Sequence, residues 1–353
     1  MRSRRRASVW LPVSSPGTAG AGGGGTRVTV DVAIAVEGVT KRFDRQVALD
    51  DVTFDVAQAT VFGLLGPNGA GKTTAIRVLT TLLRPDIGRA SVLGCDVISE
   101  AAAVRRQIGL AGQYAAVDAN LTGRENLRLI GRLTQMRRAE FCPRADELLA
   151  RFDLTDAASR PVRTYSGGMR RRLDVAAALV SRPAVLFLDE PTTGLDLRSR
   201  NSLWDMIREL VGSGTTVVLT TQYLEEADRL ADRIAVIDRG QLIANDTPAA
   251  LKARLGATVI DIGLSDEPTA IRASEILTRL PQARIDRQTN TVQVTANDGS
   301  RVLIDALHLL DAHEVRPVSL QVREPSLDDA FLQLTGRHAR DTTGDAPDGD
   351  GAR

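Results

Sequence analysis

The sequence predicts an α/β protein with a mainly parallel sheet, followed by a smaller α+β domain. Apolar runs suited to buried strands, TVFGLL, AVLFLD and TTVVLTT, alternate with stretches of helical period. Such alternation of strands and helices is typical of a parallel sheet. The chain has 353 residues, 43% of them hydrophobic, which is enough for two domains with substantial cores.

Composition disfavours several classes of protein. The chain carries 45 Lys and Arg against 44 Asp and Glu, a net charge of +1, so we expect no nucleic-acid partner. Its two cysteines, Cys95 and Cys142, lack the spacing of a metal site and are expected to be reduced thiols. No apolar run approaches the roughly 18 residues that span a bilayer, so the sequence predicts a soluble, cytosolic protein.

Both ends of the chain are expected to be disordered. Residues 1–29 combine arginines with a Gly-rich run, and no apolar segment of a signal peptide follows the arginines. We expect an unstructured extension there, and the alternative is a basic arm that touches anionic lipid or a partner. The polar tail over 337–353 is expected to be disordered too.

The first domain is predicted over residues 30–250 and should contain an antiparallel part beside the parallel sheet. The segments 34–43 and 47–56 alternate apolar and polar residues, as half-buried strands do. A helix is predicted over 72–83. The segment RIAVIDRGQLIAND (233–246) predicts a hairpin that turns at its Arg-Gly pair.

A helical subdomain is predicted over about 115–165, apart from the alternation of strands and helices. Thr122 and Glu125 have the spacing of a capping box, and a stretch of helical period follows them. A second helix is predicted over 143–152.

The second domain is predicted over 257–336. Thr247 and Pro248 form a good cap and first turn for the helix that leads into it. Residues 257–322 then have the order strand, helix, strand, strand, helix, strand, which fits a ferredoxin-like sandwich. A last helix begins after Ser326.

The segment VFGLLGPNGAGKTT fits the phosphate-loop pattern G-x-x-x-x-G-K-[ST] between a strand and a helix. Glycines allow the backbone to wrap a phosphate chain with its N–H groups inward, and the N-terminus of the helix adds positive charge. Lys72 is expected to neutralise the β- and γ-phosphates, and the Thr73 hydroxyl to bind Mg²⁺. We therefore expect ATP and Mg²⁺ as cofactors. The residues expected to bind nucleotide here are Gly66, Pro67, Asn68, Gly69, Ala70, Gly71, Lys72, Thr73 and Thr74.

Two acidic residues lie at the end of the buried run AVLFLD: Asp189 is its last residue, and Glu190 follows directly. Asp189 is expected to hold Mg²⁺, directly or through water. Glu190 follows at the mouth of the site, where it can accept a proton from the attacking water. Without a phosphate loop, this pair would equally suit an exposed strand end.

The segment YSGGM (165–169) precedes the helical stretch RRRLDVAAALVS. It places a hydroxyl and two glycines at a helix N-terminus, which is the anatomy of an anion site. Ser166, Gly167 and Gly168 are the residues expected to touch phosphate.

The four ordered segments GPNGAGKTT, YSGGM, VLFLDEPT and GLD resemble the ATP-binding subunits of ABC transporters over about 34–250. The resemblance implies an ATPase with a P-loop fold. It implies that Gln113 senses Mg²⁺ and faces the membrane partner, that Asp196 is the D-loop aspartate of GLD and helps to bind nucleotide, and that Phe43 stacks on adenine. It also implies a head-to-tail homodimer, a separate permease, and a peripheral position at the cytoplasmic face of the membrane.

Two departures from the common family pattern stand out. Tyr165 and Met169 replace a leucine and a glutamine of the signature, while the Ser-Gly-Gly is retained. Gln222 stands where most relatives have a switch histidine, and glutamine can donate a hydrogen bond but cannot carry charge; a role in catalysis and a harmless substitution are both open. With the C-terminal EPSLDDAFLQLTG, these features resemble the daunorubicin-resistance branch, which implies drug or hydrophobic-compound export.

Alternative functions stay open. An ABC-type ATPase acting on ribosomes or DNA is disfavoured, because the chain has one cassette, no long coiled-coil insert and a nearly neutral overall charge. Export of lipid, polysaccharide or sodium by the same ATPase chemistry is a closer alternative, since the permease selects the substrate. A regulatory module without turnover is disfavoured by Glu190.

Overall fold

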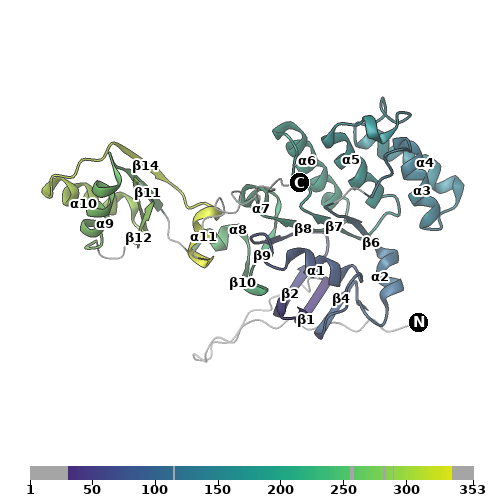
Figure 1. The fold of residues 1–353 in the computed structure, drawn as a ribbon, viewed down its shortest axis with the longest axis horizontal. Helices are drawn as coiled ribbons and strands as arrows, with labels where there is room; N and C mark the ends of the chain where they lie inside the picture. Colours follow the sequence, from purple (N-terminus) through teal and green to yellow (C-terminus); the bar gives the residue numbers. More distant parts are fainter. Residues whose placement is uncertain (1–30, 114–115, 255–257, 281–283, 289, 336–353) are drawn as a thin grey trace, which may run out of the picture.

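The computed structural model describes residues 31–113, 116–254, 258–280, 284–288 and 290–335. It has a larger unit that runs to residue 254 and a smaller unit that begins at residue 258 (Figure 1). The expectations of disorder for 1–29 and 337–353 lie outside the described residues. Within the described part of the chain, no helix is both long and apolar enough to cross a bilayer.

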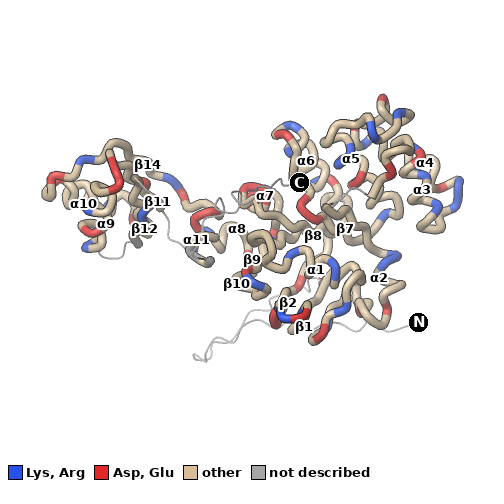
Figure 2. The backbone as a smooth tube through the Cα atoms, viewed as in Figure 1, with Lys and Arg blue, Asp and Glu red and all other residues tan. Residues whose placement is uncertain are grey.

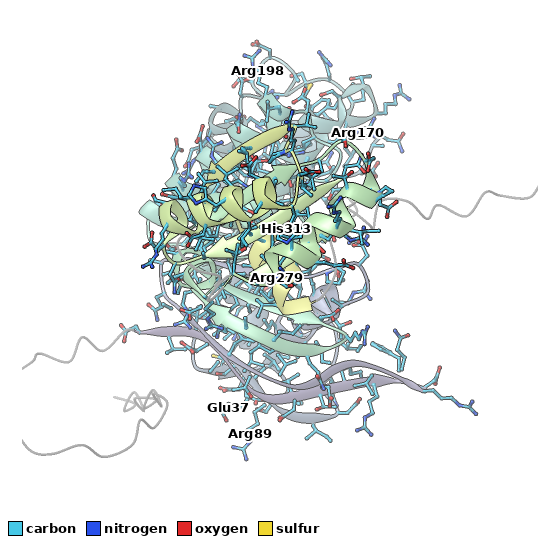
Figure 3. The ribbon with its side chains drawn as sticks, turned by 90° about the vertical axis from the view of Figure 1, so that its left-hand side faces the viewer. Glu37, Arg89, Arg170, Arg198, Arg279 and His313 are labelled. Carbon is cyan, nitrogen blue, oxygen red and sulfur yellow. The ribbon has the colours of Figure 1, made fainter. Side chains whose placement is uncertain are left out.

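An antiparallel sheet forms one layer of the larger unit. Its strands are β1 (Val32–Phe43), β2 (Gln46–Ala57), β4 (Ile87–Val92) and β5 (Cys95–Asp96), in the order β2-β1-β4-β5. The two strands predicted from alternation are therefore confirmed. Glu37 of β1 lies opposite Arg89 of β4, on the outer side of this layer (Figure 3).

A six-stranded sheet forms the centre of the larger unit, in the order β10-β9-β3-β8-β7-β6. All neighbours are parallel except β9 and β10. Every residue of the strands β3, β7 and β8 is buried. The strands are β3 (Val61–Leu65), β6 (Ile108–Ala111), β7 (Val185–Asp189), β8 (Thr216–Thr221), β9 (Arg233–Asp238) and β10 (Gln241–Asp246).

The apolar runs are continuous because both faces of this sheet are covered. In β3, Val61 and Leu65 belong to a core shared with the helices, whereas Phe62 and Leu64 belong to a core shared with the antiparallel sheet. The order of the strands also places β8 between β3 and β7. The loops that follow these three strands therefore meet at one edge of the sheet.

The hairpin of β9 and β10 turns where the sequence predicts. Arg239 and Gly240 have φ values of 48° and 81°, both positive, as a two-residue turn of type I′ requires.

In the described residues, the larger unit has eight α-helices (Figure 1). Thr122 and Glu125 form the predicted capping box, with each side chain accepting a hydrogen bond from the other residue's backbone N–H. The helices are α1 (Lys72–Leu79), α2 (Ala101–Gln107), α3 (Gly123–Leu133), α4 (Arg138–Arg151), α5 (Gly167–Ala178), α6 (Leu197–Gly212), α7 (Leu224–Leu230) and α8 (Pro248–Ala253).

Two helix boundaries differ from those predicted. The first helix ends at Leu79 rather than residue 83, because Thr80 bonds back to the Ile76 carbonyl and Thr81 takes a positive φ of 65°. Helix α4 begins at Arg138, before Pro143, since Glu140 caps its start.

The smaller unit has a four-stranded sheet in the order β12-β13-β11-β14, with every neighbouring pair antiparallel. Two helices pack on one face and share a separate core with it. The elements are β11 (Thr258–Gly263), α9 (Glu267–Leu277), β12 (Arg284–Gln288), β13 (Thr291–Ala296), α10 (Gly299–Ala312) and β14 (Ser319–Arg323).

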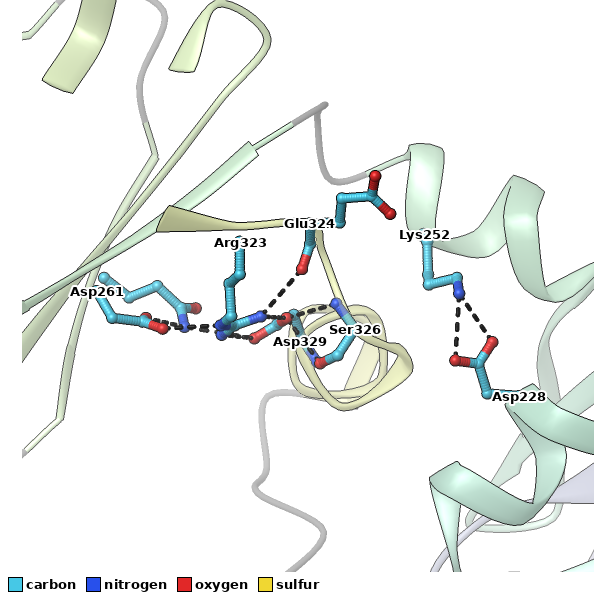
Figure 4. A network of polar contacts seen from close by, with 8 residues as sticks. Asp228, Lys252, Asp261, Arg323, Glu324, Ser326 and Asp329 are labelled. Carbon is cyan, nitrogen blue, oxygen red and sulfur yellow. Dashed lines mark hydrogen bonds and ion pairs between the residues drawn. The ribbon is translucent and has the colours of Figure 1, made fainter. Parts of the chain in front are cut away.

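The last described helix, α11 (Leu327–Thr335), connects the two units. Its apolar residues Leu327, Ala330 and Phe331 belong to the core of the larger unit. Its Asp329 accepts hydrogen bonds from Arg323, which also donates to Asp261 of the small sheet at 2.8 Å (Figure 4). Lys and Arg are interspersed with Asp and Glu over both units (Figure 2).

Candidate functional site

The loop between β3 and α1 is shaped by two glycines at points of close backbone approach. A Cβ atom on Gly66 would lie 2.1 Å from the Ile237 carbonyl oxygen, and one on Gly71 would lie 2.4 Å from that of Ala48. Gly71 also has a φ of 115°, which L side chains rarely adopt. Gly69 has a φ of 78° with open space around it. A side chain would clash at Gly66 and Gly71 and would strain the backbone at Gly69, so these glycines keep the curvature of the loop.

The Lys72 side chain lies inside this curve. It is 4% exposed, and its Nζ donates to the carbonyl oxygens of Gly66 at 2.7 Å and Pro67 at 3.0 Å. Nζ is also 3.8 Å from Oε1 of Glu190. Burial lowers the pKa of the Lys72 ammonium, while the carboxylates of Glu190 and Asp189 oppose this shift. The loop therefore holds a buried cation beside two carboxylates.

Asp189 ends β7 and joins the loop to β8. Its Oδ1 accepts hydrogen bonds from the Thr73 hydroxyl at 3.2 Å and from the Thr220 hydroxyl at 2.5 Å. The carboxylate and the Thr73 hydroxyl are hard oxygen ligands side by side next to the phosphate loop. Mg²⁺ is commonly held by one or two protein oxygens together with substrate phosphates. The residues present thus fit Mg²⁺.

Glu190 has an unusual backbone conformation for its residue type. Its φ is 48°, in the left-handed region. Its backbone N–H donates to the hydroxyl of Thr220 at 3.0 Å, and its side chain is 12% exposed. The carboxylate accepts from the Thr193 hydroxyl and reaches solvent at the edge of the sheet. This arrangement leaves Glu190 accessible to a water molecule.

The signature segment, residues 165–169, begins α5. Ser166 caps the helix by accepting from the Met169 N–H at 3.2 Å, and Ser166 and Gly167 are exposed. Tyr165 is 3% exposed and donates its hydroxyl to the Ala157 carbonyl at 2.7 Å. The absence of a side chain at Gly123 leaves room for that hydroxyl, since a Cβ there would lie 2.4 Å from it. The tyrosine that departs from the family pattern is a buried anchor for the segment.

Other predicted site residues lie at neighbouring strand ends. Gln113 is exposed two residues after β6, and Gln222 is half-buried directly after β8. Asp189 and Glu190 lie at the end of β7. The four side chains therefore lie after three adjacent strands, β6, β7 and β8.

The structure does not bring every predicted site residue to the phosphate loop. In the described part of the chain, no hydrogen bond joins that loop to residues 166–168, Asp196 or Phe43. Asp196 caps α6 by accepting from the Ser199 N–H at 2.7 Å. Phe43 ends β1 and is 45% exposed, and the centre of its ring lies 5.6 Å from the Nζ of Lys41.

Sequence reasoning missed an ion pair on α5 between a buried carboxylate and a largely buried arginine. The Arg171 and Asp174 side chains are 10% and 1% exposed, and they form an ion pair at 3.2 Å. Burial raises the pKa of the Asp174 carboxyl, and burial lowers that of Arg171. The sequence did contain one sign of this pair, because the acidic Asp174 stands between the apolar Leu173 and Val175.

A third missed group is Glu226, which is fully buried on α7. It accepts hydrogen bonds from the Thr192 hydroxyl at 3.1 Å and the Trp204 Nε1 at 3.2 Å. Burial raises the pKa of its carboxyl, while hydrogen bonds from Thr221, Trp204 and Thr192 oppose the shift. Its neighbour Glu225 is exposed, so the two glutamates could not be told apart from the sequence.

Comparison with known families and proteins gives consistent matches. A model of the ABC transporter family matches residues 49–193. The chain is 51% identical over 310 residues to a daunorubicin resistance ATP-binding protein of Streptomyces coeruleorubidus, covering 88% of this chain and 98% of the relative. It is 47% identical to a doxorubicin resistance ATP-binding protein of Mycobacterium tuberculosis, covering 86% and 94%. It is 38% identical to a Nod factor export ATP-binding protein of Sinorhizobium fredii, covering 96% of each.

Solved structures with the same fold cover the larger unit. An ATP-binding subunit of an ABC transporter superimposes with a TM-score of 0.58 at 28% identity, covering 63% of this chain and 92% of its own. A dimeric ATP-binding cassette, solved in a post-hydrolysis state with ADP and phosphate, has a TM-score of 0.56 at 25% identity, covering 61% and 98%.

Proposed function

The chain belongs to the ATP-binding proteins of ABC transporters, whose members couple ATP hydrolysis to transport, and from this premise we propose that it powers export of a drug-like or other hydrophobic compound through a separate membrane permease. Relatives named for daunorubicin or doxorubicin resistance, at 47 to 51% identity, support a drug of that kind.

The proposed ATP hydrolysis is supported mainly by the contacts between the phosphate loop and the end of β7. Lys72 neutralises the β- and γ-phosphates, and the residues of the segment 66–74 other than Pro67 surround them with backbone N–H groups. Glu190 accepts the proton of the attacking water, because it is the accessible carboxylate beside that lysine. Gln222 orients the γ-phosphate or the water with one neutral hydrogen bond.

Mg²⁺ completes the site and neutralises charge on the phosphates when it is bound. Thr73, Asp189 and Gln113 are the residues that hold or sense it. Phe43 stacks on the adenine, since it is the exposed aromatic at the end of β1.

The signature segment acts in the partner subunit. Ser166 and Gly167 are exposed and Gly168 is half-buried. Within the described part of the chain, residues 166–168 make no hydrogen bond with their own phosphate loop, so a second copy supplies this segment. We propose the head-to-tail homodimer, in which Ser166, Gly167, Gly168 and Asp196 of one copy close the nucleotide site of the other.

The remaining assignments concern the domains and their location. Residues 30–250 form the ATPase domain, with a helical subdomain over about 115–165. Residues 257–336 form a ferredoxin-like domain that regulates the subunit or stabilises its dimer; the antiparallel order β12-β13-β11-β14 supports that fold. The subunit lies at the cytoplasmic face of the membrane, bound to its permease and not to nucleic acid.

Drug efflux in a sensitive host tests the proposed function. The subunit is expressed with its permease, and accumulation of doxorubicin is compared between wild type, Glu190→Gln and a matched control, Glu225→Gln, at an exposed glutamate of α7. Wild type and the control should lower accumulation, and Glu190→Gln should not. Unchanged accumulation with wild type and with Glu225→Gln, despite normal ATPase activity of both, would reject drug export and favour another exported compound, as the Nod factor relative suggests.

A further inference from the structure

The guanidinium of Arg171 lies behind Glu190 and contacts the backbone on both sides of it. Nη2 donates to the Asp189 carbonyl oxygen at 3.0 Å, and Nε donates to that of Pro191 at 2.9 Å. These two carbonyls belong to the residues that flank Glu190. Glu190 itself has a φ of 48°, a conformation that costs free energy for a residue with a side chain and persists only where its surroundings hold it.

The same guanidinium also contacts the segment that carries Gln113. Nη1 donates to the Gly112 carbonyl oxygen at 2.5 Å, directly before Gln113. It also donates to Asp174 one turn further along α5, and the other oxygen of Asp174 accepts from the Ala116 N–H at 2.7 Å. One ion pair therefore binds backbone groups that precede and follow Gln113.

Both side chains project from α5, the helix that begins with the signature segment. Arg171 lies five residues after Ser166, between one and two turns along α5, so its contacts connect this helix to the backbone around Glu190. The planar fork of arginine is needed here, because four acceptors lie in different directions around it and a lysine ammonium cannot reach them together.

We propose that Arg171, supported by Asp174, is a positioning residue. It fixes the backbone around Glu190 and before Gln113 in position relative to α5, the helix that begins with the signature segment. Its guanidinium donates to three backbone carbonyls and to Asp174 rather than to the phosphate loop, so it acts through Glu190. This inference rests on the proposed role of Glu190 as the base.

A double-mutant cycle in the full-length protein tests the proposal. Arg171→Lys keeps the charge and loses the fork. We expect it to lower kcat by between about tenfold and a hundredfold, the loss typical of a misplaced catalytic group, with little change in the dissociation constant for ATP. In the Glu190→Gln background, the same substitution should lower the residual hydrolysis by less than about twofold, because the group through which it acts is already gone.

Two matched variants separate positioning from a general loss of folding. Arg132→Lys changes an exposed arginine near the end of α3, outside the site, and should leave kcat near that of wild type. Asp174→Asn keeps an oxygen acceptor for the Ala116 N–H and should lower kcat less than Arg171→Lys does.

The outcomes distinguish this inference from the function on which it rests. Normal turnover in Glu190→Gln alone would remove Glu190 as the base and reject the proposed chemistry. The inference is wrong, and Arg171 only structural, if Glu190→Gln is inactive but Arg171→Lys lowers kcat by the same factor in wild type and in Glu190→Gln. The same conclusion follows if Arg171→Lys weakens ATP binding instead of turnover.

Discussion

The hydroxyl of Thr73 donates to Oδ1 of Asp189 across 3.2 Å, although 116 positions separate the two residues. Thr73 follows the phosphate loop, and Asp189 ends a strand that is not adjacent to the loop's own strand. The contact exists because β8 lies between them and brings both carboxyl ends to one edge of the sheet. Two oxygens that suit Mg²⁺ are thereby placed beside the phosphates.

Removing one of these oxygens should raise the requirement for Mg²⁺. In Thr73→Ala, the Mg²⁺ concentration that gives half-maximal ATPase activity should rise by at least about tenfold, since loss of even an outer ligand commonly weakens metal binding that much. Thr134→Ala, at the exposed end of α3, serves as the control and should titrate like wild type. An unchanged Mg²⁺ titration in Thr73→Ala would take this hydroxyl out of the metal site.

Neutralising the proposed base should separate binding from hydrolysis. Glu190→Gln should bind ATP normally and lose at least about a hundredfold in turnover, as expected for loss of a general base. It should also accumulate as an ATP-bound dimer in size-exclusion chromatography. Steady-state ATPase activity near that of wild type, or of Glu225→Gln, would contradict this role.

Gln222 should matter less than Glu190. One neutral hydrogen bond contributes about 0.5 to 1.5 kcal/mol, so Gln222→Ala should slow hydrolysis by roughly twofold to twelvefold, at about 1.4 kcal/mol per decade. ATP affinity should change little, because Lys72 and the phosphate loop are intact. Gln222→His should stay active and gain a pH dependence near the imidazole pKa. A loss in Gln222→Ala as deep as in Glu190→Gln would show that the glutamine is essential.

Glu226 should make stability depend on pH. Burial raises the pKa of its carboxyl in the folded state above the value in the unfolded chain. Its stabilising contribution is therefore fully present below the ordinary pKa of glutamate, and it is lost as pH rises through the raised value. Glu226→Gln keeps a carbonyl oxygen for the Trp204 N–H and cannot ionise, so its stability should depend less on pH.

The measurement is the free energy of unfolding by urea, followed by circular dichroism at pH 5 and pH 8. Wild type should lose more stability than Glu226→Gln between these two pH values. Glu225→Gln should follow wild type because that side chain is exposed. Equal losses in wild type and Glu226→Gln would show that the Glu226 carboxyl has no raised pKa.

Local sequence patterns predicted the parts of the fold that depend on neighbouring residues. The capping box of Thr122 and Glu125 and the turn at Arg239 and Gly240 are set by a few adjacent side chains and φ angles. The phosphate loop could be predicted from its motif, and the positive φ of Gly71 is a local requirement of the same kind, although the close approach of the Ile237 carbonyl to Gly66 is a long-range contact.

Long-range contacts could not be predicted in this way. Thr220 is one threonine among several at the end of an apolar run, and nothing in TTVVLTT reveals that it faces Asp189. Arg171 stands between two other arginines, and only the fold distinguishes it from the exposed Arg170. The packing of α11 on the larger unit likewise depends on residues far apart in the chain.

The central claim is that each nucleotide site is formed by the phosphate loop of one copy and the signature segment of another. Two variants are needed, each defective in one half. Lys72→Met removes the cation from the phosphate loop. Gly167→Asp places a carboxylate where phosphate should approach, and the subunit should still fold, because a Cβ at Gly167 would meet nothing within 4 Å.

The decisive measurement is the ATPase activity of an equimolar mixture of Lys72→Met and Gly167→Asp subunits. Each variant alone should be nearly inactive. In a head-to-tail heterodimer, one site combines the intact phosphate loop of one subunit with the intact signature of the other. Random pairing should therefore restore activity toward about a quarter of the wild-type value. If the mixture stays as inactive as its components while heterodimers are shown to form, or if either variant alone hydrolyses ATP normally as a monomer, the composite site is wrong.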